Sequence, residues 1–262
     1  MLPVALTALG VGGATVFGVA IGFIFKKLSH KFSDIVLSFA AGVMLAAAVL
    51  GLVIPALEHG MAEYSSRKWL SLLVVVIGVF AGAIVLNLID KLVPHLHKMA
   101  GKEPDHHTDC GPHNREKMNK VLLFVLAIAI HNLPEGIAAG VGFGTGNHTD
   151  AILLAAGIAL QNIPEGMVIV APMLASGISP KKTFLIASMT GFIEVVGTFI
   201  GYFAGYVSVI LPFALAFAGG TMLYVISDEM IPETHSHGSE RGATYALLFG
   251  FCLMLGFDFL LG

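Results

Sequence analysis

Long apolar stretches alternate with short polar connections along the whole chain. Eight of these stretches are long enough to cross a hydrocarbon layer of about 30 Å as helices. They are approximately Leu2–Phe25, Asp34–Leu57, Leu70–Val93, Val121–Phe143, Ala151–Ala175, Thr183–Tyr206, Val209–Ile231 and Ala243–Leu261. The pattern predicts an all-α integral membrane protein with eight transmembrane helices in a single domain, residues 1–262. Because no basic residue precedes the first stretch, we expect a retained membrane helix there and not a cleaved signal peptide.

The basic residues indicate how the helices are oriented. Twelve of the 14 lysine and arginine residues lie in alternate connections, and the other two, Arg67 and Lys68, lie on the opposite side. Cytoplasmic loops of membrane proteins are enriched in lysine and arginine. The larger set is therefore predicted to be cytoplasmic, and both termini extracytoplasmic. Seven or nine spans would destroy this segregation, so it favours eight.

Composition excludes several classes of protein. Of the 262 residues, 56% are hydrophobic and only 12% are charged, whereas ordinary soluble domains carry about 25% charged residues. The formal net charge is -3 and the basic residues are confined to short connections, so no nucleic-acid partner is expected. Cys110 lies in a polar connection and Cys252 in an apolar stretch, which gives no disulfide framework. The expected location is a lipid bilayer.

A six-residue motif occurs twice, each time inside an apolar stretch. Residues 131–136 have the sequence HNLPEG, and residues 161–166 have the sequence QNIPEG. The polar residues of each copy are three or four positions apart and so share one helix face: they are His131, Asn132 and Glu135 in the first copy and Gln161, Asn162 and Glu165 in the second. Pro134 and Pro164 each remove a backbone hydrogen bond and are expected to kink their helices.

Both motifs are predicted to lie at the same depth. The turn between the fourth and fifth stretches, residues 144–150, is about 15 residues from the centre of each motif, or roughly 22 Å along a helix. The motifs are therefore expected to face each other near the middle of the membrane on antiparallel helices. Glu194 in the sixth stretch and Met44 in the second are expected at a similar level.

Three carboxylates in apolar surroundings need compensation. No lysine or arginine is predicted at mid-depth, so either the acids are protonated, because burial disfavours a charged carboxyl, or a cation binds them. Imidazole, amide and carboxylate ligands together suit a divalent transition metal, and the thioether of Met44 is a soft ligand compatible with Zn²⁺ or Cd²⁺. Met44 as ordinary apolar packing, and a proton relay in place of a metal site, are the alternatives.

Other polar residues mark possible routes to this centre. Asp90, Asp228 and Glu229 lie toward the predicted cytoplasmic side, and Asp258 lies toward the outside; apolar sequence surrounds Asp90, Glu229 and Asp258. The longest connection, residues 95–120, is predicted to be cytoplasmic and rich in histidine; it contains His95, His97, His106, His107 and His113. These histidines could capture metal ions loosely, or they could belong to a solvated linker.

Eight spans, a histidine-rich connection after the third span and the HNLPEG/QNIPEG pair resemble the ZIP (Zrt/Irt-like) family of divalent-metal transporters, and especially its bacterial GufA-like branch. The resemblance covers essentially the whole chain. It implies an inverted-repeat bundle around kinked fourth and fifth helices, a homodimer, and transport of Zn²⁺ or related ions such as Cd²⁺, Fe²⁺ or Mn²⁺ into the cytoplasm. The metal would be the transported substrate, with no separate cofactor.

The resemblance also implies a binuclear site. One metal would bind His131, Glu135, Gln161 and Glu165 with Met44 beside it, and the second would bind Asn132, Glu135, Asn162, Glu165 and Glu194. Many members of the family have histidine at the position of Gln161, and some have aspartate at that of Asn162. Both differences weaken the ligands and leave the choice of metal open.

The sequence thus predicts a transporter that works by alternating access, and not an enzyme. An intramembrane zinc-dependent hydrolase is the alternative, but it would need an open coordination position and a general base, and no His-Glu-x-x-His motif is present. A sensor that acts through the histidine-rich connection is a third hypothesis.

Overall fold

The computed structural model describes residues 1–25, 29–64, 67–100, 129, 132–146, 148–175, 177–205, 207 and 209–261, with the side chains of residues 30, 90, 92–100, 144, 145, 175 and 261 left aside. Within these ranges the chain is helical and contains no strand. The described part confirms the predicted all-α membrane architecture, since seven of its helices are long and apolar enough to cross a membrane.

The helices follow the predicted apolar stretches closely. The first half contains α1 (Leu2–Ile24), α2 (His30–Ala48), the π-helical turn η1 (Val49–Val53), α3 (Ile54–Glu63) and α4 (Lys68–Ala100). Residues 132–141 are helical and continue into the 3₁₀ turn η2 (Gly142–Thr145). The second half contains α6 (His148–Ala175), α7 (Pro180–Gly205), α8 (Leu211–Val225), the π-helical turn η3 (Ile226–Met230), α9 (Ile231–Thr234) and α10 (Glu240–Leu261).

Two boundaries differ from the sequence prediction. The third span was expected to end near Val93, but α4 continues to Ala100, so the histidine-rich connection begins later than residue 95. The chain from Lys31 to Glu63 is a single candidate span of 33 residues because η1 absorbs the break before Pro55 without ending the helix. Proline removes one backbone hydrogen bond, and a π-bulge is a common way for a helix to accommodate this.

The ends of the helices have local causes. The side chain of Ser29 caps α2 by accepting a hydrogen bond of 3.2 Å from the backbone N–H of Phe32, which satisfies one of the free donors of the first turn. Gly146 has a φ of 79° in the turn before α6, and Gly238 has a φ of 81° in the loop before α10. Glycine adopts this left-handed conformation without steric cost, so both chain reversals are encoded locally.

Long helices pack side by side in a bundle, in which α1 lies against α6 and α7, α2 against α10, and α4 against α8. Gly166, the glycine of the second motif, lets α6 approach α1 closely, because a Cβ atom at this position would overlap the carbonyl oxygen of Thr15. On the other motif helix, a Cβ at Gly136 would overlap the backbone of Glu194. Small residues permit such contacts between helices in membranes, and here they bring α1 and α7 directly against the two motifs.

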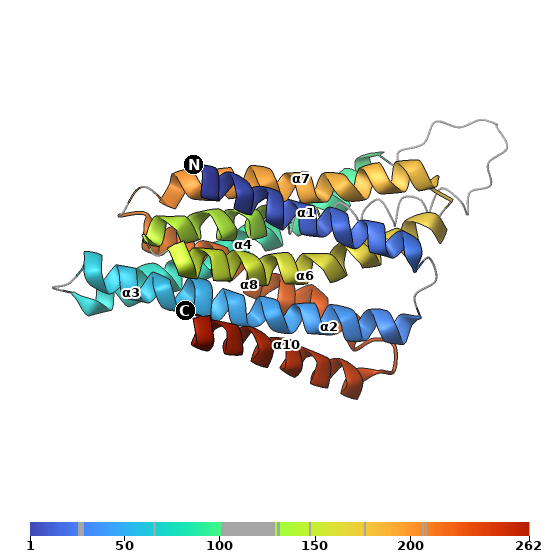
Figure 1. The fold of residues 1–262 in the computed structure, drawn as a ribbon. Helices are drawn as coiled ribbons and strands as arrows, with labels where there is room; N and C mark the ends of the chain where they lie inside the picture. Colours follow the sequence, from blue (N-terminus) through green and yellow to red (C-terminus); the bar gives the residue numbers. More distant parts are fainter. Residues whose placement is uncertain are drawn as a thin grey trace.

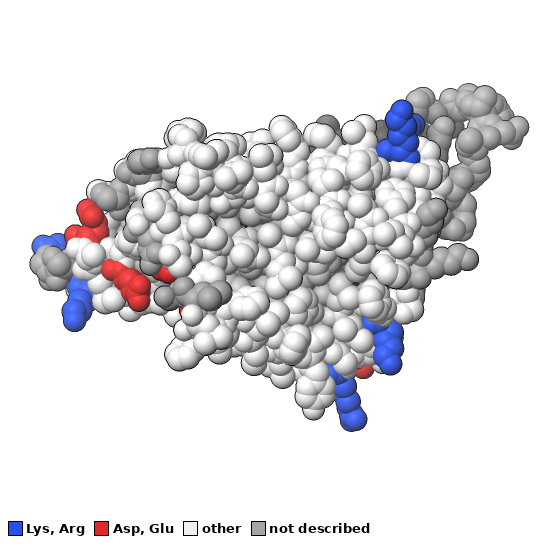
Figure 2. All heavy atoms as spheres, viewed as in Figure 1, with Lys and Arg blue, Asp and Glu red and all other residues white. Residues whose placement is uncertain are grey.

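The outer surface of the bundle is apolar between two charged ends. In Figure 1, α1, α4, α6 and α8 run in one direction and α2, α7 and α10 in the other, and both termini lie toward the same end. The face in Figure 2 shows lysine and arginine side chains only near the two ends. Large apolar side chains such as Phe80, Phe203 and Phe249 are exposed on α4, α7 and α10, as expected for helices that face lipid.

Candidate metal site

The motif side chains lie in the interior of the bundle, half-way along their helices. Asn162 is the fifteenth of 28 residues in α6, and Glu194 is the fifteenth of 26 in α7. None of the predicted ligands whose side chains are described is more than 9% exposed; these are Met44, Asn132, Glu135, Gln161, Asn162, Glu165 and Glu194. His131 lies outside the described residues. The helix α6 continues through Pro164 without interruption.

The carboxylate of Glu194, in α7, accepts hydrogen bonds from three other helices. The hydroxyl of Thr15 in α1 donates to Oε1 of Glu194 at 2.7 Å, and Nδ2 of Asn132 donates to the same oxygen. Nδ2 of Asn162 donates to Oε2 at 2.7 Å and is also 3.3 Å from the carbonyl oxygen of Val11. The carboxylate of Glu194 is therefore held from three sides, and both asparagine amides are fixed in orientation.

This orientation leaves oxygen atoms buried without a partner. Among the described residues, no hydrogen-bond donor reaches Oδ1 of Asn132, Oδ1 of Asn162 or either carboxylate oxygen of Glu135. The same holds for both polar atoms of the Gln161 side chain, which lies beside the Glu135 carboxylate without meeting the geometry of a hydrogen bond. A buried polar group left without a hydrogen bond costs about 1–3 kcal/mol, and more when it is charged. Several such oxygens in one place form a set of acceptors that a cation could occupy.

Three carboxyl groups lie close together at the same place. The carboxylates of Glu165 and Glu194 are close enough to that of Glu135 to repel it, and Gln161 lies beside Glu135. Across the described part of the chain, no three His, Cys, Asp or Glu side chains converge on a single point. The other described side chains at this place that could bind a metal ion are the amides of Asn132, Gln161 and Asn162, through their oxygens. A hard or borderline cation fits such a set of ligands.

Met44 is fully buried on α2. It belongs to the same apolar cluster as Ala138 and Ala139, which follow the first motif, and Ile158, which precedes the second. The helix that carries Met44, α2, packs against α6, the helix of the second motif.

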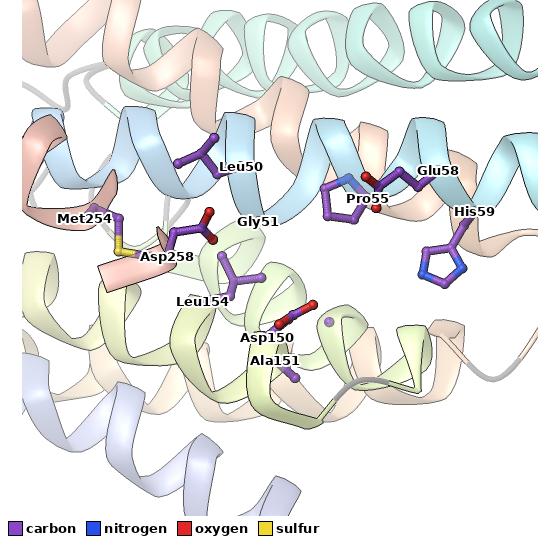
Figure 3. A pocket seen from close by; sticks show the side chains of 11 residues that line it. Leu50, Gly51, Pro55, Glu58, His59, Asp150, Ala151, Leu154, Met254 and Asp258 are labelled. Atoms are coloured by element: carbon purple, nitrogen blue, oxygen red, sulfur yellow. The ribbon is translucent and has the colours of Figure 1, made fainter. Parts of the chain in front are cut away.

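An acidic pocket opens at the end of the bundle near the C-terminus. It has a volume of about 260 Å³ and lies between α3, the first turn of α6 and the last turns of α10. Its polar lining consists of Glu58, His59, Asp150 and Asp258, whose side chains face a common space in Figure 3. Asp150 is close enough to Asp258 to repel it electrostatically. The predicted route residue Asp258 therefore borders a solvent-accessible cavity.

The other predicted route residues lie toward the opposite end. Asp228 and Glu229 belong to the π-helical turn η3, where Asp228 is exposed and Glu229 half-buried. The hydroxyl of Tyr224 donates to Oδ2 of Asp228 at 3.1 Å and accepts from Nδ2 of Asn87 at 2.8 Å, which links η3 to α4. The side chains of Asp90, His95 and His97, and all of His106, His107 and His113, lie outside the described residues.

Three residues near these sites were missed by the sequence analysis. Thr15 lies in a span whose only polar side chains are those of Thr7 and Thr15, and no sequence signal indicates that it reaches Glu194. Asp150 was assigned only to a turn, although its position next to a membrane span could have suggested a role. Tyr224 lies four residues before Asp228 and hence on the same helix face, a spacing from which the contact could have been predicted.

The fold and the buried centre define a polytopic membrane protein with a cation-compatible polar site at mid-depth. The family model described as "ZIP Zinc transporter" matches residues 2–122 and 116–258, which together span nearly the whole chain. The chain belongs to the ZIP family of zinc transporters, as its motifs indicated. This is a family of transporters and not of enzymes, so the hydrolase alternative has no support.

Individual relatives agree with this assignment. The chain is 39% identical over 258 residues to "Zinc transporter GufA" of Myxococcus xanthus, covering 98% of each protein. It is 34% identical over 250 residues to "Zinc transporter ZIPB" of Bordetella bronchiseptica, covering 95% of this chain and 78% of that protein. A ZupT zinc transporter of Chlorobium chlorochromatii is 34% identical over 260 residues. The bacterial relatives and the apolar helices support a multi-pass protein of the bacterial cytoplasmic membrane.

Proposed function

We propose that this chain transports Zn²⁺ into the cytoplasm by alternating access through the buried site between the two motifs. The observation that carries the proposal is the set of buried oxygens of Asn132, Glu135, Gln161 and Asn162 that have no hydrogen-bond partner among the described residues. Related divalent ions, namely Cd²⁺, Fe²⁺ and Mn²⁺, have the same charge and accept the same ligands. The names of the relatives favour Zn²⁺ as the substrate.

The proposed ligands form two adjacent sites. The first consists of His131, Glu135, Gln161 and Glu165, with the thioether of Met44 beside it. The second consists of Asn132, Glu135, Asn162, Glu165 and Glu194. The orientation of Asn132 and Asn162 supports the second site, because their amide nitrogens donate to Glu194 and leave their oxygens available to an ion.

Each part of this arrangement has a chemical task. The carboxylates of Glu135 and Glu165 supply negative charge, and their oxygens take the place of water molecules that hydrate a divalent ion in solution. The neutral amides add ligands without adding charge, so the ion is bound less tightly than by a cage of carboxylates and imidazoles. Such moderate affinity suits a substrate that must leave on the other side of the membrane.

The route through the membrane is proposed to begin at the acidic pocket. Asp258, Asp150, Glu58 and His59 would attract a cation from outside, since a cleft lined by one sign of charge raises the local concentration of counter-ions. On the cytoplasmic side, Asp90, Asp228 and Glu229 would receive it, and the histidine-rich connection of residues 95–120 would bind it loosely. The carboxylates of Asp228 and Glu229 lie at the end of the bundle opposite to the pocket.

We further propose eight spans, both termini extracytoplasmic, and an inverted repeat within one domain. The repeat is supported by a shared feature of the second and seventh predicted spans. In each, a π-helical turn precedes an Ile-Pro pair, η1 before Ile54-Pro55 and η3 before Ile231-Pro232. The two spans run in opposite directions (Figure 1), as inverted repeats require. The functional unit in the lipid bilayer is proposed to be a homodimer.

Zinc flux into proteoliposomes tests the proposed function. Glu135→Gln and Glu165→Gln keep the volume of each side chain but remove its charge, and each should lower the initial rate of Zn²⁺ uptake at least tenfold. Glu63→Gln is the matched control, because Glu63 is exposed at the end of α3 and does not line the pocket. Uptake within twofold of the wild type in both motif variants would show that the buried site does not carry the ion.

A further inference from the structure

A second cluster of metal-ligating groups lies far from the motifs, at the opposite end of the bundle from the acidic pocket. Asp34, in the first turns of α2, pairs with His237, in the loop between α9 and α10. Nδ1 of His237 is 3.1 Å from Oδ1 of Asp34. The side chain of Asp34 is only 3% exposed, whereas that of His237 is 33% exposed. The cluster is thus buried on one side and accessible to solvent on the other.

The pair with His237 does not satisfy the buried carboxylate. Oδ2 of Asp34 is buried and has no hydrogen-bond partner within the described residues. The hydroxyl of Ser38, which is fully buried, also has none there. Ser38 follows Asp34 by four positions and therefore lies on the same face of α2. One carboxylate oxygen and one hydroxyl oxygen are consequently buried on a single face of α2, and the carboxylate pairs with an imidazole.

We propose that Asp34, Ser38 and His237 form a peripheral binding site for a divalent cation of the Zn²⁺ type. Imidazole nitrogen with carboxylate and hydroxyl oxygen is a ligand set for a borderline ion, and solvent would complete the coordination. Zinc binds nitrogen and carboxylate oxygen at about 2.0–2.2 Å, so two such ligands at a tetrahedral angle are about 3.4 Å apart. The distance of 3.1 Å between Nδ1 and Oδ1 is close to this value, so small side-chain shifts would admit the ion.

An ion bound at this site would restrain the neighbouring loop. His237 lies shortly after α9 and η3, and η3 carries Asp228 and Glu229. An ion held between His237 and Asp34 would tie the loop, residues 235–239, to α2. It would therefore restrain the segment through which we propose that the transported ion leaves. The existence of the binding site does not depend on that proposed function.

A neighbouring histidine provides a matched control. His235 is in the same loop, but its ring nitrogens contact the carbonyl oxygen of Ile231 at 2.8 Å and the hydroxyl of Thr244 at 3.1 Å. Both contacts hold His235 within the hairpin of α9 and α10. Its replacement should leave the peripheral site intact.

Calorimetric titration of the full-length protein in detergent with Zn²⁺ tests the proposal. His237→Ala and Asp34→Asn should each bind one equivalent fewer than the wild type, whereas His235→Ala should bind the wild-type number. Glu135→Gln should retain the peripheral equivalent, so failure of the transport site is distinguishable from failure of this one. Unchanged stoichiometry in His237→Ala and Asp34→Asn would overturn the proposal and leave an ion pair only.

A rescue experiment separates ligation from a structural role. Thiolate is a strong ligand for Cd²⁺, so His237→Cys should bind Cd²⁺ at this site at least tenfold more tightly than His237→Ala. His237 is partly exposed, so neither substitution is expected to prevent folding. Equal Cd²⁺ affinity in the two variants would contradict the proposed coordination.

Discussion

Replacing Thr15 with valine tests the organisation of the buried site directly. Valine has nearly the same shape as threonine but lacks the hydroxyl that donates to Oε1 of Glu194 at 2.7 Å. The side chains of Thr15 and Glu194 are fully buried, so bulk water cannot replace the lost donor. Among the described residues, the carboxylate of Glu194 would then retain the two asparagine amides as its donors.

The expected magnitude follows from the burial of the acceptor. A buried group that loses its hydrogen-bond partner costs about 1–3 kcal/mol, and in a chain of this size 1 kcal/mol shifts Tm by roughly 2–4 °C. Thr15→Val should therefore lower Tm by about 2–12 °C. Thr15→Ser keeps the hydroxyl and should lower Tm by less than half as much.

Thermal unfolding of the purified protein in detergent, without added metal, measures this effect. Thr198→Val is the control, because Thr198 is equally buried but its hydroxyl bonds only the backbone carbonyl of Glu194 in its own helix, at 2.9 Å. If Thr15→Val and Thr198→Val changed Tm equally, the carboxylate of Glu194 would not depend on α1, and the arrangement of the site around it would be refuted.

Three further perturbations follow from the geometry. Gly166→Ala should reduce the yield of folded protein severalfold, because its Cβ would overlap a carbonyl oxygen of α1, whereas Gly13→Ala should be neutral since nothing lies within 4 Å of the added atom; size-exclusion chromatography compares the two. Tyr224→Phe should lower the maximal rate of zinc uptake severalfold with little change in KM, because Asp228 loses its link to α4; an unchanged rate would argue against that link. Asp258→Asn should instead raise KM severalfold, and increasingly so at low ionic strength, where charge attracts cations most strongly; equal effects at low and high salt would contradict an electrostatic role.

Hydrophobic patterning was sufficient to predict the seven apolar helices that the described part of the chain contains. Apolar runs of about 20 residues have few alternatives to a membrane-spanning helix, and the observed helices begin and end close to the predicted residues. The extension of α4 to Ala100 was missed because lysines and histidines interrupt the apolar run without preventing helix formation. The π-helical turns were not predictable from periodicity, although Pro55 and Pro232 mark their positions.

The buried cluster was predictable because polar groups are costly in a membrane. Repeated carboxylates and amides at matching depth indicated that Asn132, Glu135, Asn162 and Glu165 would meet, and the structure brings them into the interior together with Glu194. The pairing within the cluster was not predictable, since the donor Thr15 comes from a span with no polar motif. Helix packing through Gly166 determines that contact, and such packing depends on the whole bundle.

Anomalous X-ray scattering from crystals of the protein grown with Zn²⁺ tests the central claim most directly. We expect an anomalous peak between the two motif helices, about 2.0–2.2 Å from carboxylate oxygens of Glu135 and Glu165, and its loss in Glu135→Gln. The claim would be contradicted by an ordered site without zinc, in which Glu135 and Gln161 form hydrogen bonds to water or to each other and zinc binds only elsewhere on the molecule.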